Sequence, residues 1–75
     1  MEYAVVIEPT KTGFSAYVPD VPGCVAAGET EAEVTALIRE ALQFHFEELR
    51  LDGEPIPPST SRVAYVKVPE PAAVA

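Results

Sequence analysis

Apolar residues recur at helical spacing in one stretch of the chain, residues 30–51. From Val34 onward they return every three or four residues, which is the pattern of a helix with one buried face. Thr30 occupies the N-cap position, and Glu33 completes a capping box in which each side chain accepts a hydrogen bond from the other residue's backbone N–H. Gly53 offers the left-handed conformation that ends many helices. We therefore predict one helix here, and it needs a sheet to cover its apolar face.

Three earlier stretches have the composition of strands. Residues 2–8 are β-branched and aromatic, residues 14–18 alternate apolar and polar positions, and residues 24–27 form a shorter apolar run. The first two are separated by a glycine-containing turn at residues 9–13, and the last two by a corner at residues 19–23 that contains two prolines and a glycine. Short connections favour an antiparallel meander of these three strands.

The chain after the helix begins with a proline-rich connection, residues 54–61, which cannot be helical. Residues 62–68 then alternate again and predict a fourth strand, which we expect to return parallel to the first. The order β-β-β-α-β gives an α+β fold with one small, mainly antiparallel sheet covered by a single helix. We expect a single domain over residues 1–68 and a flexible tail over residues 69–75.

The length of 75 residues limits the core, because a chain this short buries only about 60% of its unfolded surface. Self-association into a dimer or tetramer is the expected source of further burial. Cys24 is the only cysteine, and there is no secretory signal, which together favour a cytoplasmic protein. No apolar run reaches the roughly 20 residues that span a bilayer, so no membrane association is expected.

Acidic residues dominate the charge, with a formal net charge of −7 for the chain. Residues 29–54 hold eight acidic and two basic side chains, a net of −6. Such a surface repels nucleic acid, because phosphate neutralisation dominates nucleic-acid affinity. Two interpretations stay open: a solvated face kept acidic for solubility, and a surface that binds a basic protein.

Three segments carry a family resemblance: Tyr-Val-Pro-Asp-Val-Pro-Gly-Cys at residues 17–24, Gly-Glu-Thr at 28–30, and Asp-Gly-Glu-Pro-Ile-Pro at 52–57. Together they resemble the HicB-like antitoxin family from about residue 3 to residue 68. The resemblance implies a truncated ribonuclease H fold and a HicA-like partner, a small basic toxin that cleaves mRNA. Many members also carry a C-terminal DNA-binding segment. Only seven residues follow Val68, so this chain looks like a short form without one.

Candidate catalytic groups are few. His45, the only histidine, falls within the apolar stripe and is expected to be partly buried. Cys24 has no CxxC partner and is expected to act as a small buried hydrophobe. Nuclease chemistry needs several carboxylates around two Mg²⁺ ions, and the sequence offers only Glu2, Glu8 and Asp20 near the strands. We therefore predict no catalytic residue, no metal site and no cofactor, and expect a protein that is not an enzyme.

Two features have both a structural and a binding interpretation. Phe44 and Phe46 lie on opposite edges of the apolar stripe, so each either covers a sheet edge or emerges into a subunit or toxin interface. The corner at residues 19–23 is either a turn that the strands require or a rigid loop, beside the acidic helix start, that contacts the toxin.

We interpret the chain as an antitoxin-type module that neutralises a HicA-like toxin by covering its RNA-binding or active surface. The alternatives are an orphan structural or regulatory homo-oligomer, a degenerate nuclease-like enzyme and, disfavoured by charge, a DNA-binding repressor. The predicted toxin contacts are all acidic: Asp20, Glu29, Glu31, Glu33, Glu40, Glu47 and Glu48.

Overall fold

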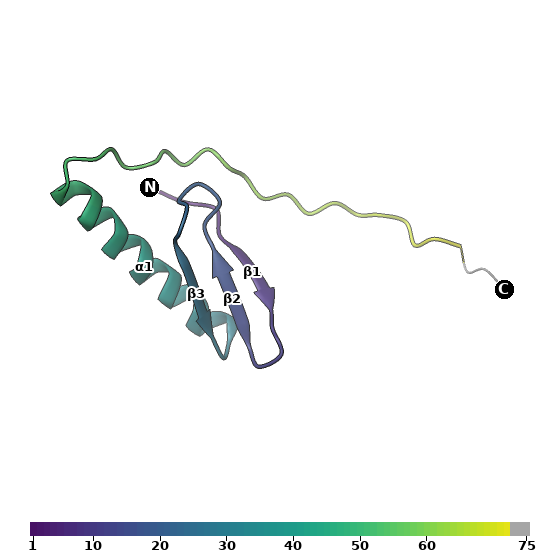
Figure 1. Cartoon of the computed structure of the whole chain (residues 1–75). Coiled ribbons are helices and arrows are strands. Elements are labelled where there is room, and N and C mark those ends of the chain that lie inside the picture. The colour runs from purple at the N-terminus through teal and green to yellow at the C-terminus, as the bar shows by residue number, and fades with distance from the viewer. Residues whose placement is uncertain (73–75) are drawn as a thin grey trace.

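A computed structural model describes residues 1–72 and has three strands followed by one helix. Figure 1 shows a small sheet crossed by a long helix, with the C-terminal segment running away from both. This arrangement confirms the predicted α+β class with a small antiparallel sheet and a single covering helix. The elements are β1 (Val6–Pro9), β2 (Phe14–Tyr17), β3 (Val25–Gly28) and α1 (Glu31–Leu51).

The three strands form the predicted antiparallel meander, in the order β1-β2-β3. The turn before β2 is closed by the Thr10 N–H, which donates to the Gly13 carbonyl at 2.8 Å. Gly13 lies so close to β3 that an added Cβ would stand 2.3 Å from the Gly28 carbonyl oxygen. Glycine is therefore required at residue 13 by the approach of two backbones, since its φ angle is not positive.

Helix α1 begins at the predicted N-cap and ends at the predicted glycine, but only the Thr30 half of the capping box forms: among the described residues, the Glu33 side chain accepts no hydrogen bond from the Thr30 N–H. The Thr30 hydroxyl accepts a hydrogen bond from the Glu33 N–H at 3.0 Å. At the other end Gly53 adopts a φ of 70°, and its N–H donates to the Arg50 carbonyl. The Glu54 N–H donates to the Leu49 carbonyl at 2.9 Å, which completes a Schellman motif.

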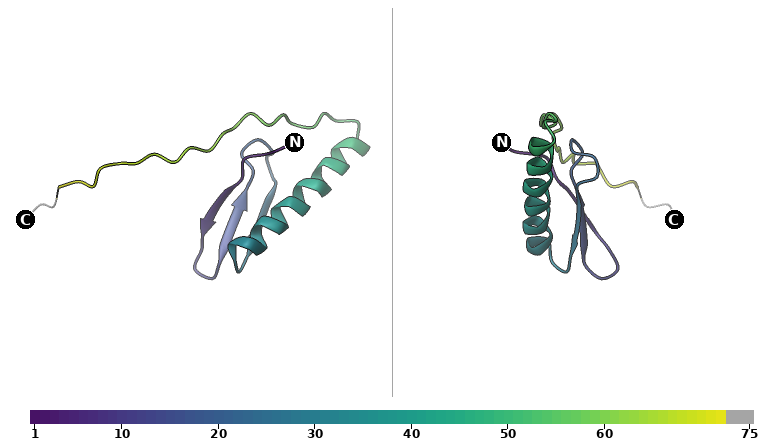
Figure 2. Two further views of the ribbon diagram at one scale, coloured as in Figure 1. Left: turned by 180° about the vertical axis from the view of Figure 1, so that it is seen from behind. Right: turned by 60° about the vertical axis from the view of Figure 1, so that its left-hand side comes forward.

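The core lies between one face of the sheet and the inner face of α1. Ala16 of β2 and Val18, one residue beyond the strand, face the helix, and both are 2% exposed. They meet Val34 and Ile38, the buried residues of α1. The right-hand view of Figure 2 shows these two layers, with the helix on one side of the sheet only. The opposite face of the sheet has no covering layer among residues 1–72.

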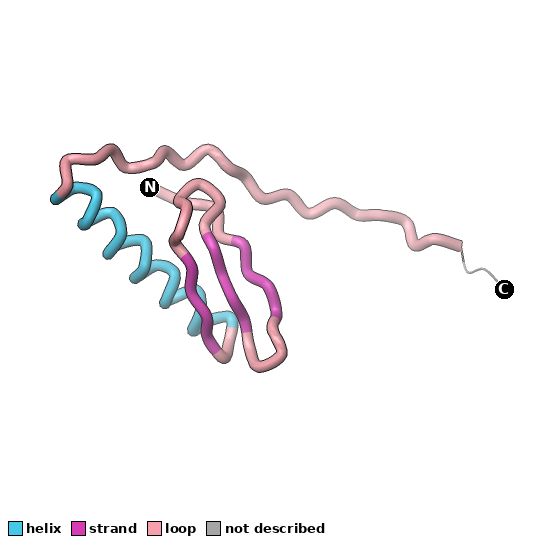
Figure 3. The backbone as a smooth tube through the Cα atoms, viewed as in Figure 1, coloured by secondary structure: helices cyan, strands magenta, loops and turns pink. Residues whose placement is uncertain are grey.

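The predicted fourth strand does not form. Residues 52–72 contain no strand and no helix, and Figure 3 shows them as one continuous loop. Residues 62–68 do alternate, but among residues 1–72 no sheet edge lies alongside them to accept their backbone hydrogen bonds. Their apolar side chains are left exposed: Val63, Tyr65, Val66 and Val68. Residues 73–75 of the predicted flexible tail lie outside the described residues, and flexibility of the rest stays a prediction.

The extended segment dominates the dimensions of the molecule. The radius of gyration is 16.2 Å, whereas a compact domain of this length has about 11 Å. Two contacts tie the start of the segment to the folded body: the Tyr3 hydroxyl donates to the Pro57 carbonyl at 2.6 Å, and Asp20 binds Thr60 and Ser61. Beyond Ser61 the described chain makes no hydrogen bond to the body.

Candidate protein-binding surface

The outer side of α1 carries a row of acidic residues around an exposed aromatic ring. Glu33, Glu40 and Glu47 recur every seven residues and therefore share one side of the helix, opposite Val34 and Ile38. All three are exposed. The helix thus separates its buried stripe from an acidic stripe, and the sequence periodicity predicts both.

Phe44 lies within this acidic stripe. Its ring is 69% exposed, and helical spacing makes Glu40, Glu47 and Glu48 its neighbours at positions three or four residues away. Leu51 follows one heptad later and is 71% exposed. We call the side chains of Glu40, Phe44, Glu47, Glu48 and Leu51 the outer patch of α1.

Phe46 has the opposite environment, although it is only two residues away. Its ring packs against Tyr3 with 5.2 Å between ring centroids and 50° between the ring planes. It also contacts the buried core, so it acts as an ordinary core residue that covers the segment before β1. Phe44 is therefore exposed, whereas Phe46 is half-buried. Whether either contacts a second subunit stays a prediction.

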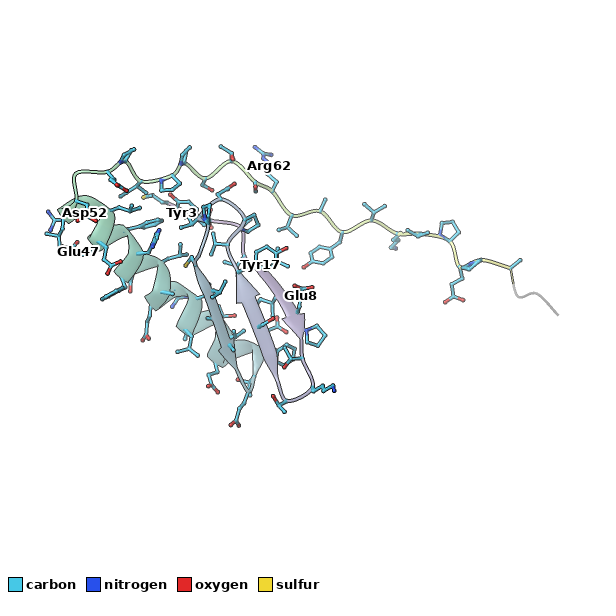
Figure 4. All side chains as sticks on the ribbon, in the orientation of Figure 1. Tyr3, Glu8, Tyr17, Glu47, Asp52 and Arg62 are labelled. Carbon is cyan, nitrogen blue, oxygen red and sulfur yellow. The ribbon has the colours of Figure 1, made fainter. Side chains whose placement is uncertain are left out.

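Glu47 is the one outer-patch acid with a fixed partner within the described chain. Both its carboxylate oxygens accept hydrogen bonds from the Arg50 guanidinium, with Nε at 3.1 Å from Oε2. These bonds and the charge of Arg50 hold the pKa of Glu47 below its usual value. Figure 4 shows Glu47 on the last turns of the helix, away from the sheet. The carboxylate therefore remains ionised and accessible at neutral pH.

The acids predicted to bind a partner do not form one site. Glu29, Glu31 and Glu33 surround the start of α1 and are exposed. Asp20 lies in the corner between β2 and β3. Because β3 runs antiparallel to β2, the corner and the helix start lie at opposite ends of the sheet. The expectation that the corner stands beside the acidic helix start was therefore wrong.

Asp20 is already engaged with the extended segment. Its two carboxylate oxygens accept hydrogen bonds from both the N–H and the hydroxyl of Thr60 and Ser61, at 2.7–3.1 Å. These bonds, those of Ser61 most strongly, lower the pKa of Asp20 from 3.8 to about 2. The sequence predicts a toxin contact for Asp20 and does not indicate this partner, because forty residues separate Asp20 from Thr60.

The candidate chemical groups are placed as follows. Cys24 is 4% exposed, and burial raises the pKa of its thiol, in agreement with the predicted role as a small hydrophobe. His45 is half-buried, as predicted. Within residues 1–72 no three His, Cys, Asp or Glu side chains come together to hold a metal ion. In the same residues, no helix is long and apolar enough to cross a bilayer.

Two further surfaces lie outside the predicted partner contacts. The outer face of the sheet bears a row formed by Val6, Tyr17 and Val25, which are paired across the three strands. Val25 is 66% exposed and Tyr17 42% exposed. A second surface is a groove of about 570 Å³ between the residues before β1 and α1, lined by Tyr3, Val5, Ile38, Leu42 and Phe46 among others. Alternation predicts the first surface; the second depends on how the helix crosses the sheet.

The chain is similar in sequence to three proteins of bacterial, archaeal and phage origin. The chain is 40% identical over 70 residues to an uncharacterized 14.9 kDa protein of Haemophilus phage HP1, covering 93% of this chain and 53% of that protein. It is 37% identical over 70 residues to Antitoxin HicB 2 of Photorhabdus laumondii, covering 92% and 50%. The chain thus spans about half the length of these two relatives. A UPF0150 protein of Thermoplasma acidophilum is 36% identical over 58 residues, covering 76% of this chain and 84% of that protein.

A solved structure described as a HicA3 and HicB3 toxin-antitoxin complex contains a similar chain. The match has a TM-score of 0.69 and 38% sequence identity, and it covers 79% of this chain and 70% of that chain. The family model described as "HicB_like antitoxin of bacterial toxin-antitoxin system" matches residues 3–74. Because this match includes the sheet, the helix and the extended segment, the chain belongs to the HicB-like antitoxin family.

Proposed function

We propose that this chain is an antitoxin-type binding module that neutralises a HicA-like toxin, a small basic mRNA-cleaving protein, by covering its RNA-binding or active surface. Family membership and the likeness to a chain of a HicA3–HicB3 complex support a toxin of this kind as the partner. In this proposal the chain acts by binding and not by catalysis, in the cytoplasm, and contacts no nucleic acid directly.

The observation that carries the proposed binding face is the exposure of Phe44 within an acidic surround. Protein interfaces concentrate binding energy in a central aromatic residue, with polar residues at the rim. The outer patch has this composition: one exposed ring with Glu40, Glu47 and Glu48 beside it. Carboxylates that match a basic partner mainly accelerate the encounter and select the partner, whereas the aromatic residue slows dissociation.

The other predicted acids have different places in the proposal. Glu29, Glu31 and Glu33 extend the negative surface along the same helix toward its start and would contribute to steering. Asp20 contributes only if the extended segment leaves it, since both its oxygens are occupied by Thr60 and Ser61.

The test uses a HicA-like toxin from the same genome, with affinity measured by calorimetry and function by protection of RNA from cleavage. Phe44→Ala is expected to weaken binding by roughly 30-fold, the effect of losing a central aromatic contact of about 2 kcal/mol. Glu40→Gln with Glu48→Gln is expected to lower the association rate, and the loss should shrink at high salt.

Val25→Ala is the matched control, because Val25 is also exposed and apolar but lies on the outer face of the sheet. It is expected to leave toxin affinity unchanged. The proposed face is wrong if Phe44→Ala binds as tightly as the native chain while Val25→Ala binds weakly. The proposed function itself is wrong if the native chain leaves RNA cleavage by the toxin unaffected.

A second candidate function, a homo-oligomer without a toxin, draws on the same exposed ring, since Phe44 is equally suited to contact a second copy. Phe44→Ser examined alone by light scattering separates the two. A mass lower than that of the native chain indicates that Phe44 contacts a second subunit. An unchanged mass supports Phe44 as a toxin contact.

A further inference from the structure

The extended residues 62–68 have the properties of a strand that lacks its sheet. Val63 is 54% exposed, Tyr65 96%, Val66 79% and Val68 77%. Both sides of the alternation are apolar, with Val63 and Tyr65 on one side and Val66 and Val68 on the other. A seven-residue segment that exposes this much apolar surface, with its backbone donors and acceptors unpaired in the described chain, is typical of a strand that pairs with an available sheet edge.

The β1 edge is available in the same molecule. Strand β1 pairs with β2 on one side only, and no strand of the described chain pairs with its other side. Residues 3–5 continue toward the start of β1 without a strand partner. Together, residues 3–9 match the seven-residue length of residues 62–68.

The surroundings of this edge suit a strand with two apolar faces. On the helix side is the groove of about 570 Å³, whose walls include Val5, Leu42 and Phe46. On the other side, the row of Val6, Tyr17 and Val25 begins at β1 with the half-buried Val6. A strand added here would bury side chains of both parities, one set against α1 and the other beside the row.

Charge favours the same pairing. Residues 1–54 hold eleven acidic and three basic side chains, a net of −8, whereas residues 55–69 hold Arg62 and Lys67 and no acid. Glu2 and Glu8 flank the β1 edge at a spacing close to that of Arg62 and Lys67. Figure 4 shows Glu8 on β1 and Arg62 at the start of the exposed segment. The basic segment and the acidic edge therefore attract in either strand direction.

The course of the segment favours a second copy of this chain, and not the chain's own segment, as the occupant of the edge. Asp20 fixes Thr60 and Ser61 at the corner between β2 and β3, and from there the segment runs away from its own sheet (Figure 1). The long axis of the molecule reaches 61 Å for this reason. Two copies that exchange their segments reciprocally form a closed two-fold dimer, because each contributes one segment and one edge.

We infer that residues 62–68 of each chain add as a fourth strand to the β1 edge of a second copy, forming a strand-exchanged dimer. This assignment is independent of toxin binding, since it concerns the antitoxin chain alone. It also provides the extra burial that a 75-residue chain needs.

The test is made on the full-length chain without toxin. Light scattering is expected to give at least twice the 8.0 kDa mass of one chain. Ala64→Pro and Lys67→Pro are then compared. Successive backbone N–H groups of a strand point to opposite sides, so one of these two prolines removes a donor from the ladder and the other removes a donor that faces outward. One variant should raise the dissociation constant by roughly 30-fold or more, and the other should have a much smaller effect.

Ala72→Pro lies beyond the segment and should leave the dissociation constant unchanged. Lys67→Gln measures how much of the effect of Lys67→Pro comes from the lost charge, and its effect should be smaller than that of a proline that removes a ladder donor. Circular dichroism verifies that α1 remains folded in every variant. A native chain that is monomeric at high concentration overturns the inference, and so does a dimer that neither segment proline weakens.

Exchange between chains is read from a refolded mixture of isotope-labelled and unlabelled protein. Intermolecular NOEs between the Tyr65 ring or Val66 methyls and the methyls of Val5, Val6 or Ile7 are expected. Contacts between these groups only within one chain would show that the segment pairs with its own β1, which contradicts the inference. A loss of toxin binding with the dimer intact would bear on the outer patch alone, so the two proposals fail separately.

Discussion

Strand β2 and residues 62–68 have similar sequence patterns and different fates. Both alternate, and both contain alanine and tyrosine. In β2, Ala16 is 2% exposed between two hydrogen-bonded neighbouring strands. In the later segment, Tyr65 is 96% exposed, and no strand of the described residues lies beside it. The difference is explained by connection. Short turns bring β1 and β3 alongside β2, while a proline-rich connection carries residues 62–68 away from their own sheet. An alternating sequence favours a strand, but the strand forms only where the fold places another strand beside it.

The largest difference in folding stability is expected when a valine in each region is replaced by aspartate. Val18→Asp places an unpaired charge in the core, where Val18 is 2% exposed, and is expected to cost about 3–5 kcal/mol. That loss is a large share of the stability of a small domain. Val66→Asp alters a side chain that is 79% exposed and should leave the helical circular dichroism of the body intact. If Val66→Asp also unfolds the body, then the stability of the body depends on the extended segment, which contradicts this comparison.

A smaller loss of stability is expected where the backbones of Gly13 and Gly28 approach each other in the meander. Gly13→Ala places a Cβ 2.3 Å from the Gly28 carbonyl oxygen, so one backbone must move, at a cost of roughly 1–3 kcal/mol. Gly23→Ala is the control: it meets nothing within 4 Å, and its φ of 85° costs about 1–2 kcal/mol in conformational strain alone. Urea denaturation should rank Gly13→Ala as the more destabilising. The reverse order would mean that the hairpin yields more readily than its geometry indicates.

The smallest effect concerns the hydrogen bonds that join Asp20 of the folded body to Thr60 and Ser61 of the extended segment. Asp20 in the attached state has a pKa of about 2, below the ordinary 3.8, because Ser61 and Thr60 donate to its carboxylate. A lowered pKa means that attachment is fully favoured above about pH 4 and is lost as the pH falls through about 2. The amide resonances of Thr60 and Ser61 should therefore shift within this window. Asp20→Asn should abolish that pH dependence while the body stays folded; a shift that persists in Asp20→Asn would have to come from another group.

Much of the body follows from local sequence, as its caps and strands show. Thr30 and Gly53 mark the ends of α1 as predicted, because capping depends on residues within one turn of the helix. The acidic stripe with Phe44 follows equally from helical spacing. The sequence did not reveal that Phe46 would be covered by Tyr3, since that contact joins the two ends of the body.

Local patterns along this chain determined the helix, three of the four predicted strands, which face of each is apolar, and where acidic charge accumulates. Tertiary structure alone decided that Asp20 binds Thr60 and Ser61, that the corner lies at the far end of the sheet from the helix start, and that residues 62–68 remain without a partner in one chain. The physical reason is the range of the interactions. Turns, caps and amphipathic faces depend on residues a few positions apart, whereas strand pairing and long-range hydrogen bonds depend on where the whole chain places its edges.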